Sequence, residues 1–255
     1  MTSTALLHAT GLTKHFDGLA AVDGVSLSLS LGRIHAVIGP NGAGKSTLTH
    51  LLSGDLLATS GRVVLGQVDV TGWPPHRIAR QGLGRSYQKT NIFLPYTVWD
   101  NVHLAAWACE DRALWRWQVW WRSAADLASA RARCSRALEL AGLQDKHAWV
   151  AGTLSHGEQR QLEIAMTLAT EPQVLLLDEP LAGMGVAEAQ RMVALLLALK
   201  KNHAILLVEH DMDAVFSLAD TLTVMVNGQV IASGSPDEIK AHAQVQAAYL
   251  GDASP

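Results

Sequence analysis

The sequence lacks the excess of basic residues typical of proteins that coat nucleic acid. Its 255 residues contain 20 Lys and Arg against 23 Asp and Glu, a formal net charge of −3, so no nucleic-acid partner is expected. Cysteine is scarce: Cys109 and Cys134 are too few for a disulfide framework in a chain of this length. No charged-then-apolar leader opens the chain, so we expect a cytosolic protein without a redox role.

Long apolar runs are also missing. The longest aliphatic run, Val193 to Leu199, is far shorter than the roughly 20 residues that cross a bilayer as a helix, so the chain is not expected to span a membrane alone. Hydrophobic residues nevertheless make up 49% of the sequence, and the mean hydropathy is +0.14. This composition supports a sizeable core and predicts a globular protein.

The spacing of apolar residues changes along the chain. Short apolar segments separated by glycines predict strands at 5–9, 25–31, 33–38 and 62–70. Helical spacing from Thr97 to about Leu143, with Thr97 and Asp100 as a capping box, predicts a helical insert. Beyond it, helices at 159–169, 188–200 and 213–218 alternate with strands at 174–177, 204–208 and 221–226. This alternation predicts a parallel sheet covered on both faces.

A glycine-rich segment between a predicted strand and a predicted helix carries the clearest chemistry. The pattern G-x-x-x-x-G-K-[ST] is matched by Gly39, Pro40, Asn41, Gly42, Ala43, Gly44, Lys45 and Ser46, followed by Thr47. The glycines let backbone N–H groups converge on phosphate oxygens, and the helix N-terminus adds its positive dipole. Lys45 would reach the terminal phosphates, Ser46 would bind Mg²⁺ and Thr47 would donate to a nearer phosphate. The alternative is an ordinary glycine-rich turn before a helix.

Two carboxylates end a later predicted strand. Asp178 and Glu179 follow the apolar residues 174–177, and ligands bind at the carboxyl ends of strands in sheets of this kind. Asp178 would hold the water shell of Mg²⁺, while Glu179 would accept a proton from water that attacks the terminal phosphate. Such a pair is elsewhere often a solvated loop, but the phosphate loop upstream favours the catalytic interpretation.

A third segment separates the possible nucleotide-binding proteins. Leu154-Ser-His-Gly-Glu-Gln159 resembles the L-S-G-G-Q signature of the ATP-binding cassette family, and Ser155 with Glu158 forms a capping box for the following helix. Phosphate loop, Gln88, signature, Asp178-Glu179 and His210 follow one another as in that family across essentially the whole chain. A P-loop kinase, by contrast, would have no use for the signature.

The resemblance implies a fold and a division into domains. The fold would be an α/β P-loop NTPase with a RecA-like parallel core, an N-terminal antiparallel β subdomain and a helical insert subdomain. Residues 1–88 and 157–255 would form the nucleotide-binding core with its β subdomain. Residues 89–156 would form the helical subdomain, which ends at the signature.

The resemblance also assigns roles to single residues. Lys45, Glu179 and His210 would be catalytic, with His210 contacting the terminal phosphate, and Gln88 would join Ser46 and Asp178 at Mg²⁺. Phe16 would stack on adenine. Ser155, Gly157 and Glu158 would bind the ATP of a second ATPase subunit in a head-to-tail dimer. The first of the two usual signature glycines is His156 here, which would be costly if that position needs positive φ.

A single cassette without a further domain resembles the ATPase subunit of a bacterial importer. Phrases at 71–80, 91–101 and 248–251 resemble importers of branched-chain amino acids and their urea-transporting relatives. This implies permease subunits, a second ATPase that is a copy or a paralogue, an indirectly engaged solute-binding protein, and a location on the cytoplasmic face of the inner membrane. Alternatives are a urea or amide importer and a soluble cassette that acts on a macromolecule.

Two further features concern partners. Ile92, Phe93 and Leu94 lie after Gln88, where we expect them to contact a partner helix. Five of the eight tryptophans, from Trp107 to Trp121, lie within fifteen residues, and residues 107–136 carry six Arg against three acids. That composition suits a membrane interface or a helical partner, or else packing within the insert.

Overall fold

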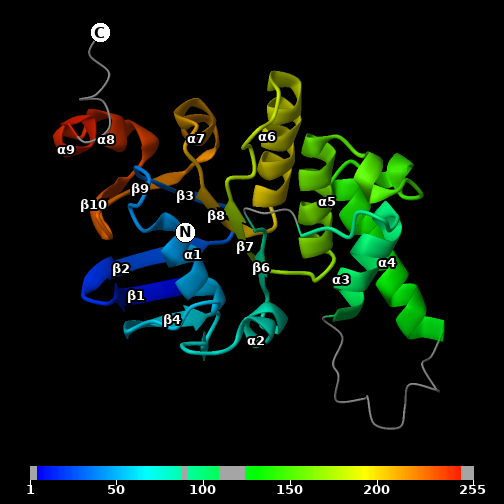
Figure 1. Ribbon diagram of the computed structural model, residues 1–255, viewed down its shortest axis with the longest axis horizontal. Coiled ribbons are helices and arrows are strands. Elements are labelled where there is room, and N and C mark those ends of the chain that lie inside the picture. The colour runs from blue at the N-terminus through cyan, green and yellow to red at the C-terminus, as the bar shows by residue number, and fades with distance from the viewer. Residues whose placement is uncertain (1–4, 88–90, 109–123, 248–255) are drawn as a thin grey trace.

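The central element is a six-stranded sheet, seen in the computed structural model, which describes residues 5–87, 91–108 and 124–247 (Figure 1). Its strand order is β10-β9-β3-β8-β7-β6, with bounds Gln229–Gly234, Thr221–Val226, Ile34–Ile38, Ala204–Val208, Val174–Asp178 and Leu83–Arg85. The last five run parallel, and β10 pairs antiparallel with β9. The predicted parallel sheet is therefore confirmed, with an antiparallel edge strand that we did not predict.

A second, antiparallel sheet is built from the N-terminal part of the chain. Its order is β2-β1-β4-β5, with bounds Leu19–Ser30, Ala5–Phe16, Ser60–Leu65 and Val68–Asp69. The predicted single strand at 62–70 is wrong: Gly66, with a φ of +63°, turns the chain so that β4 and β5 form a hairpin. A residue without a Cβ adopts this left-handed backbone at little cost.

The helices lie around the central sheet. They are α1 (Lys45–Ser53), α2 (Pro75–Arg80), α3 (Val98–Ala108), α4 (Ala124–Leu140), α5 (His156–Leu168), α6 (Val186–Lys200), α7 (Met212–Leu218), α8 (Pro236–Ala241) and α9 (Ala243–Val245), with 3₁₀ turns η3 (Gln144–Lys146) and η4 (Ala151–Thr153). In Figure 1, α3, α4 and α5 gather on one side of the molecule and the antiparallel sheet lies on the other. This is the α/β fold that the sequence predicted.

Two hydrophobic cores cover the two faces of the central sheet. In β7, Leu175 and Leu177 enter the core shared with α3 to α8, whereas Leu176 enters the core shared with α1 and the antiparallel sheet. All five residues of β3, β7 and β8 are buried, because strands covered on both faces need no polar alternation. The prediction of a sheet covered on both faces is confirmed.

The helical insert starts as predicted. Thr97 Oγ1 accepts from the Asp100 N–H at 3.0 Å, and the Asp100 carboxylate accepts from the Thr97 N–H at 3.3 Å. This capping box begins α3, which packs on α4 and α5. The division of the chain at residues 88 and 157 stays a prediction.

Short elements escaped the sequence analysis. β6 has three residues, too few for a pattern, and its place at the sheet edge is given by its pairing with β7. Helix α2 begins at Pro75, where the missing N–H has no helical partner to lose. Helix α5 begins at His156, three residues before the predicted start.

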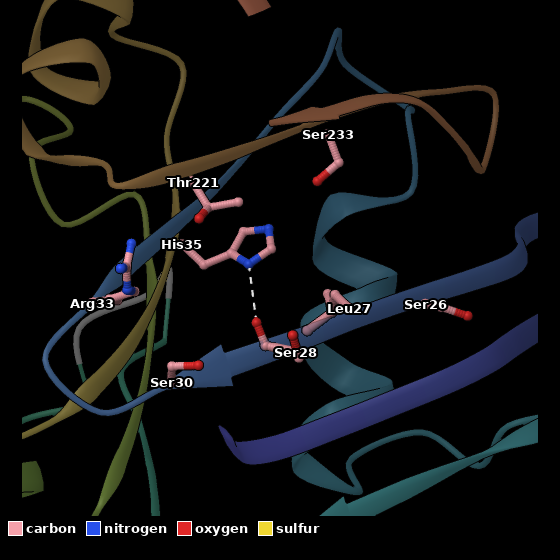
Figure 2. Close-up of a pocket in the computed structure, with 8 residues that line it drawn as sticks. All are labelled: Ser26, Leu27, Ser28, Ser30, Arg33, His35, Thr221 and Ser233. Carbon is pink, nitrogen blue, oxygen red and sulfur yellow. Dashed lines mark hydrogen bonds between the residues drawn. The ribbon is translucent and has the colours of Figure 1, made fainter. Parts of the chain in front are cut away.

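A polar hollow of about 390 Å³ lies between β2, β3, β9 and β10 (Figure 2). None of the predicted site residues lines it. His35 on β3 stands beside it, 8% exposed, with Nδ1 3.2 Å from the Ser28 carbonyl oxygen and Nε2 2.7 Å from Thr223 Oγ1. A neutral ring that donates from Nδ1 and accepts at Nε2 satisfies both contacts.

We expect His35 to lower stability in acid. Burial lowers the pKa of its imidazole below 6.5, although the Ser28 carbonyl opposes the shift. Below pH 6.5, His35 is therefore protonated in the unfolded chain but stays neutral in the folded chain. As the pH decreases, the free energy of unfolding falls by up to about 1.4 kcal/mol per pH unit until the lowered pKa of the folded state is reached. Above pH 6.5 the group has no effect.

Urea unfolding of wild type and His35→Gln between pH 7.5 and 5.5 measures this. The variant should show the shallower pH dependence. His8→Gln, on an exposed histidine of β1, is the matched control. Equal slopes for wild type and His35→Gln would contradict the assignment.

Candidate functional site

The phosphate loop connects β3 to α1 and encloses its own lysine. Lys45 Nζ donates to the carbonyl oxygens of Gly39 at 2.6 Å and Pro40 at 3.0 Å. Gly44 caps α1 with a φ of 98°, a left-handed backbone that favours glycine. A Cβ at Gly39 would lie 2.2 Å from the Met225 carbonyl oxygen, so no side chain fits there. The loop thus has the left-handed glycine and the close backbone packing of a phosphate cradle.

The surroundings of Lys45 act on the pKa of its ammonium group in opposite directions, and the net effect lowers it. Burial lowers the pKa of its ammonium group, whereas Glu179 and Asp178 favour the charged form. Ser46 is exposed beside it, and Thr47 is half-buried. The cation of Lys45 and the carboxylates of Asp178 and Glu179 therefore lie close enough to interact, where the phosphate loop and β7 end. The roles of these residues and of the two hydroxyls stay predictions.

Asp178 is the last residue of β7 and is buried. Burial raises the pKa of its carboxyl, while Arg85 opposes the shift; Arg85 Nη2 lies 3.9 Å from Asp178 Oδ2. The next residue, Glu179, has a φ of 49° and its N–H donates to the Val208 carbonyl oxygen at 2.8 Å. A non-glycine residue in this region is strained, and such strain gathers at functional sites.

His210 lies beside Glu179, and a buried carboxylate binds the backbone N–H groups of His210 and Leu181. His210 Nδ1 is 3.8 Å from Glu179 Oε1 and 3.8 Å from Glu209 Oε2. Glu209, 1% exposed, accepts from the N–H groups of Leu181 at 2.8 Å and His210 at 3.1 Å. Burial raises the pKa of Glu209. It joins the segment after β7 to the segment after β8.

The sequence analysis missed both Glu209 and Arg85. Glu209 ends a strand at the same sheet edge as Asp178, and that position was a usable signal. Arg85, buried at the end of β6, donates to Asp55 at 2.6 Å, Ser53 at 2.7 Å and Thr49 at 3.2 Å. It therefore fixes α1 next to Asp178, and only the three-dimensional neighbours of β6 reveal this.

The residue before Gln88 is held by the helix that follows the signature. The Tyr87 N–H donates to Glu163 Oε1 at 2.9 Å, and the Tyr87 carbonyl oxygen accepts from Arg160 at 2.7 Å. Arg160 and Glu163 are themselves paired at 2.9 Å and buried on α5. Gln88 lies outside the described residues, but the chain that leads to it is anchored to α5.

The signature serine is the N-cap of α5, as predicted. Ser155 Oγ accepts from the Glu158 N–H at 3.3 Å, and Glu158 accepts from the Ser155 N–H at 3.1 Å. Lys146 pairs with Glu158 at 2.6 Å. Four non-glycine residues have positive φ among those that the structure describes, and His156 is not one of them. His156 therefore carries no cost of a left-handed backbone conformation.

The signature does not lie beside the phosphate loop of its own chain. In Figure 1, α5 and α1 occupy different parts of the molecule, and the Ser155 side chain bonds to Glu188 on α6. Phe16, at the end of β1, is 46% exposed, with Lys14 Nζ 5.1 Å from the ring centroid. Phe16 is thus not part of the hydrophobic core, and adenine stacking stays a prediction.

Exposed apolar side chains mark the start of the insert. Phe93 and Leu94 are about half exposed, and the ring of Tyr96, equally exposed, lies 5.7 Å from that of Phe93. The backbone of Phe93 bonds to the buried side chain of Asn101 in both directions. Ile92 is partly buried and packs against the core; its part in a contact surface stays a prediction. Most of the tryptophan cluster lies outside the described residues.

Comparisons with known proteins agree on one family. Residues 22–182 match the model described as ABC transporter, and residues 229–254 match the branched-chain amino acid ATP-binding cassette transporter model. The high-affinity branched-chain amino acid transport ATP-binding protein BraF of Pseudomonas aeruginosa is 35% identical over 98% of this chain and 100% of its own. Its counterpart LivG of Escherichia coli is 37% identical with the same coverage.

Solved structures give the same result. A nucleotide-free ATP-binding cassette of an ABC transporter has a TM-score of 0.84 and 31% identity, covering 96% of this chain and 99% of its own. The ADP conformation of another such cassette also has a TM-score of 0.84, with 32% identity, covering 98% of this chain and 100% of its own.

Proposed function

The chain belongs to the ATP-binding cassette family of transporters, and from this premise we propose that it is the ATP-hydrolysing subunit of an importer of branched-chain amino acids. The observation that carries the proposal is the match of residues 229–254 to the branched-chain amino acid cassette model, beyond the general match of residues 22–182. The relatives BraF and LivG, named for branched-chain amino acid transport, are similar over 98% of the chain. Neither the urea importer nor the soluble cassette is favoured by a comparable observation.

ATP would bind with its phosphates in the loop from Gly39 to Thr47. Backbone N–H groups and Lys45 would hold the phosphates, and Phe16 would stack on adenine. Ser46 and Asp178 offer the hard oxygen donors that Mg²⁺ prefers alongside phosphates and water, and Gln88 would complete the set. The ion would neutralise phosphate charge.

Hydrolysis would depend on Glu179. Its carboxylate would accept a proton from water aimed at the terminal phosphate. His210, 3.8 Å from Glu179, would contact the same phosphate and mark its position. Glu209 would position His210 through the backbone, because it binds the His210 N–H and the Leu181 N–H together.

The signature would serve a second ATPase subunit. Ser155, Gly157 and Glu158 lie at the N-terminus of α5, where N–H groups and the helix dipole attract anions. With α5 away from α1 in the same chain, the phosphate would come from ATP bound to the other subunit, a copy or a paralogue. Two ATP molecules would then bridge a head-to-tail dimer.

The membrane part of the importer would lie on other chains. None of the helices in the described part of the chain is long and apolar enough to cross a bilayer. We infer that permease subunits recruit this chain to the cytoplasmic face of the inner membrane, and that a solute-binding protein engages it only through them.

Uptake measurements test the proposed solute. Cells that lack the chain should take up labelled leucine, isoleucine and valine slowly, and the wild-type gene should restore uptake whereas Lys45→Ala should not. Urea uptake in the same strains is the comparison. Loss of urea uptake with normal leucine uptake would replace the proposal by the urea alternative.

We expect Phe93→Asp to release the chain from its permease. Phe93 is 51% exposed, so the charge should be tolerated in the free protein. It would be buried without a partner against an apolar groove in the complex. Membrane fractionation of cells that co-express the permease subunits should show the variant in the soluble fraction, with ATP binding unchanged.

Leu57→Asp is the matched control. Leu57 is 61% exposed and lies between α1 and β4, away from the insert in sequence. It should stay with the membrane. If Phe93→Asp lowers the melting temperature and stays membrane-bound, Phe93 is a packing residue and the docking assignment is wrong.

A further inference from the structure

The carboxylate of Glu188 is hydrogen-bonded to the signature serine, Ser155. Glu188, in the first turn of α6, accepts from Ser155 Oγ at 2.8 Å through Oε1. Its Oε2 accepts from the Gly185 N–H at 3.4 Å. The carboxylate also accepts from the Gly157 N–H, and these contacts, with Ser155 first, lower the pKa of Glu188. One anion therefore bridges the N-termini of two helices, α5 and α6.

The second glycine of the signature makes this approach possible. A Cβ at Gly157 would lie 2.8 Å from Glu188 Cδ and 2.9 Å from Oε1, closer than a real Cβ allows. The Glu188 carboxylate thus packs directly against the backbone of α5 at Gly157. This is where N–H groups, the dipole and a hydroxyl together suit a phosphate oxygen.

The hydroxyl of Ser155 has a single proton to donate. The hydroxyl donates a hydrogen bond to Glu188, while its oxygen accepts one from the Glu158 N–H. To donate to a phosphate, Ser155 must first release Glu188, since a hydroxyl carries one O–H. The two negative groups would also repel each other if both stayed.

We propose that Glu188 is an internal anion that holds the phosphate position of the signature and is displaced when ATP of the second subunit docks there. This rests on the proposed function of the signature. Arg191, three residues further along α6, already stabilises the charge of Glu188 and offers it an alternative neighbour one turn away. The exchange sets the affinity of the signature for ATP and restores its structure after the nucleotide leaves.

Dimerisation under saturating Mg-ATP tests the exchange. In a Glu179→Gln background, which should keep ATP intact, adding Glu188→Gln should lower the protein concentration for half-dimerisation about tenfold. A neutral amide is a weaker ligand than a carboxylate for Ser155, by about half the hydrogen-bond strength, and each dimer has two such sites. ATP affinity of the dilute monomer should not change.

Glu238→Gln in the same background is the matched control. The carboxylate of Glu238 also accepts from a serine hydroxyl at a helix N-terminus, that of Ser235 at the start of α8, where no phosphate is predicted, so dimerisation should not change. Weaker or equal dimerisation with Glu188→Gln would overturn the inference.

A further variant separates the inference from the function on which it rests. Ser155→Ala should weaken the dimer if the signature binds ATP. If Ser155→Ala weakens it and Glu188→Gln does not strengthen it, the exchange alone is wrong. If Ser155→Ala has no effect on the dimer, the signature assignment and the exchange fall together.

Discussion

Lys45→Ala should abolish productive ATP binding. Lys45 supplies the positive charge of the phosphate loop, and its ammonium group already lies among oxygen acceptors, 2.6 Å from the Gly39 carbonyl. Loss of a charged hydrogen-bond donor and of its attraction to the terminal phosphates should weaken binding at least about a hundredfold, equivalent to about 2.7 kcal/mol. Calorimetric titration with ATP and Mg²⁺ measures it.

The control for this variant is Lys201→Ala. Lys201 is exposed just after α6, so the net charge changes equally while the loop stays intact. It should bind ATP as the wild type does. Wild-type affinity in Lys45→Ala would remove the phosphate site from this loop.

Glu179→Gln should bind ATP normally and hydrolyse it slowly. The amide fills the space of the carboxylate but accepts no proton, and losing a general base typically costs about 10²–10⁴-fold in rate. Single-turnover release of phosphate at saturating ATP is the measurement, because it is independent of nucleotide affinity.

Glu171→Gln controls for the backbone. Glu171 is the residue after Thr170 and has a φ of 53°, close to the 49° of Glu179, but its carboxylate pairs with Arg136 on the surface. This change should leave hydrolysis unaltered. Hydrolysis at the wild-type rate in Glu179→Gln would assign the base to another group.

Local patterns predicted the parts of the site that are contiguous in sequence. The phosphate loop, the Ser155 capping box and the carboxylates after β7 each combine a turn or strand end with side chains next to it. Nothing local marks Arg85, because its side-chain partners lie 30 to 36 residues upstream. Glu209 follows a predicted strand, but its partner Leu181 lies 28 residues away, after β7. The same holds for Glu188, whose partner Ser155 is 33 residues away.

The fold shows the same division. Buried runs predicted β7 and β8, and their flanks predicted the order of strands and helices. They could not predict that the antiparallel sheet, rather than a second layer of helices, shares a core with α1. A buried apolar strand can be covered by a helix or by a sheet, and the packing of side chains in three dimensions determines which of the two covers it. The β4–β5 hairpin was missed because its turn at Gly66 falls within one apolar stretch.

Adjacent residues of β7 have a consequence for unfolding. Leu175 belongs to the core that includes Val102 and Leu138 of the insert, and Leu176 belongs to the core under the antiparallel sheet. If the elements that cover one face of the central sheet unfold, they expose β7, and the elements on the other face lose a strand against which they pack. The helices of the insert and the N-terminal sheet should therefore melt as one cooperative unit, and thermal scans that follow either layer should share one midpoint.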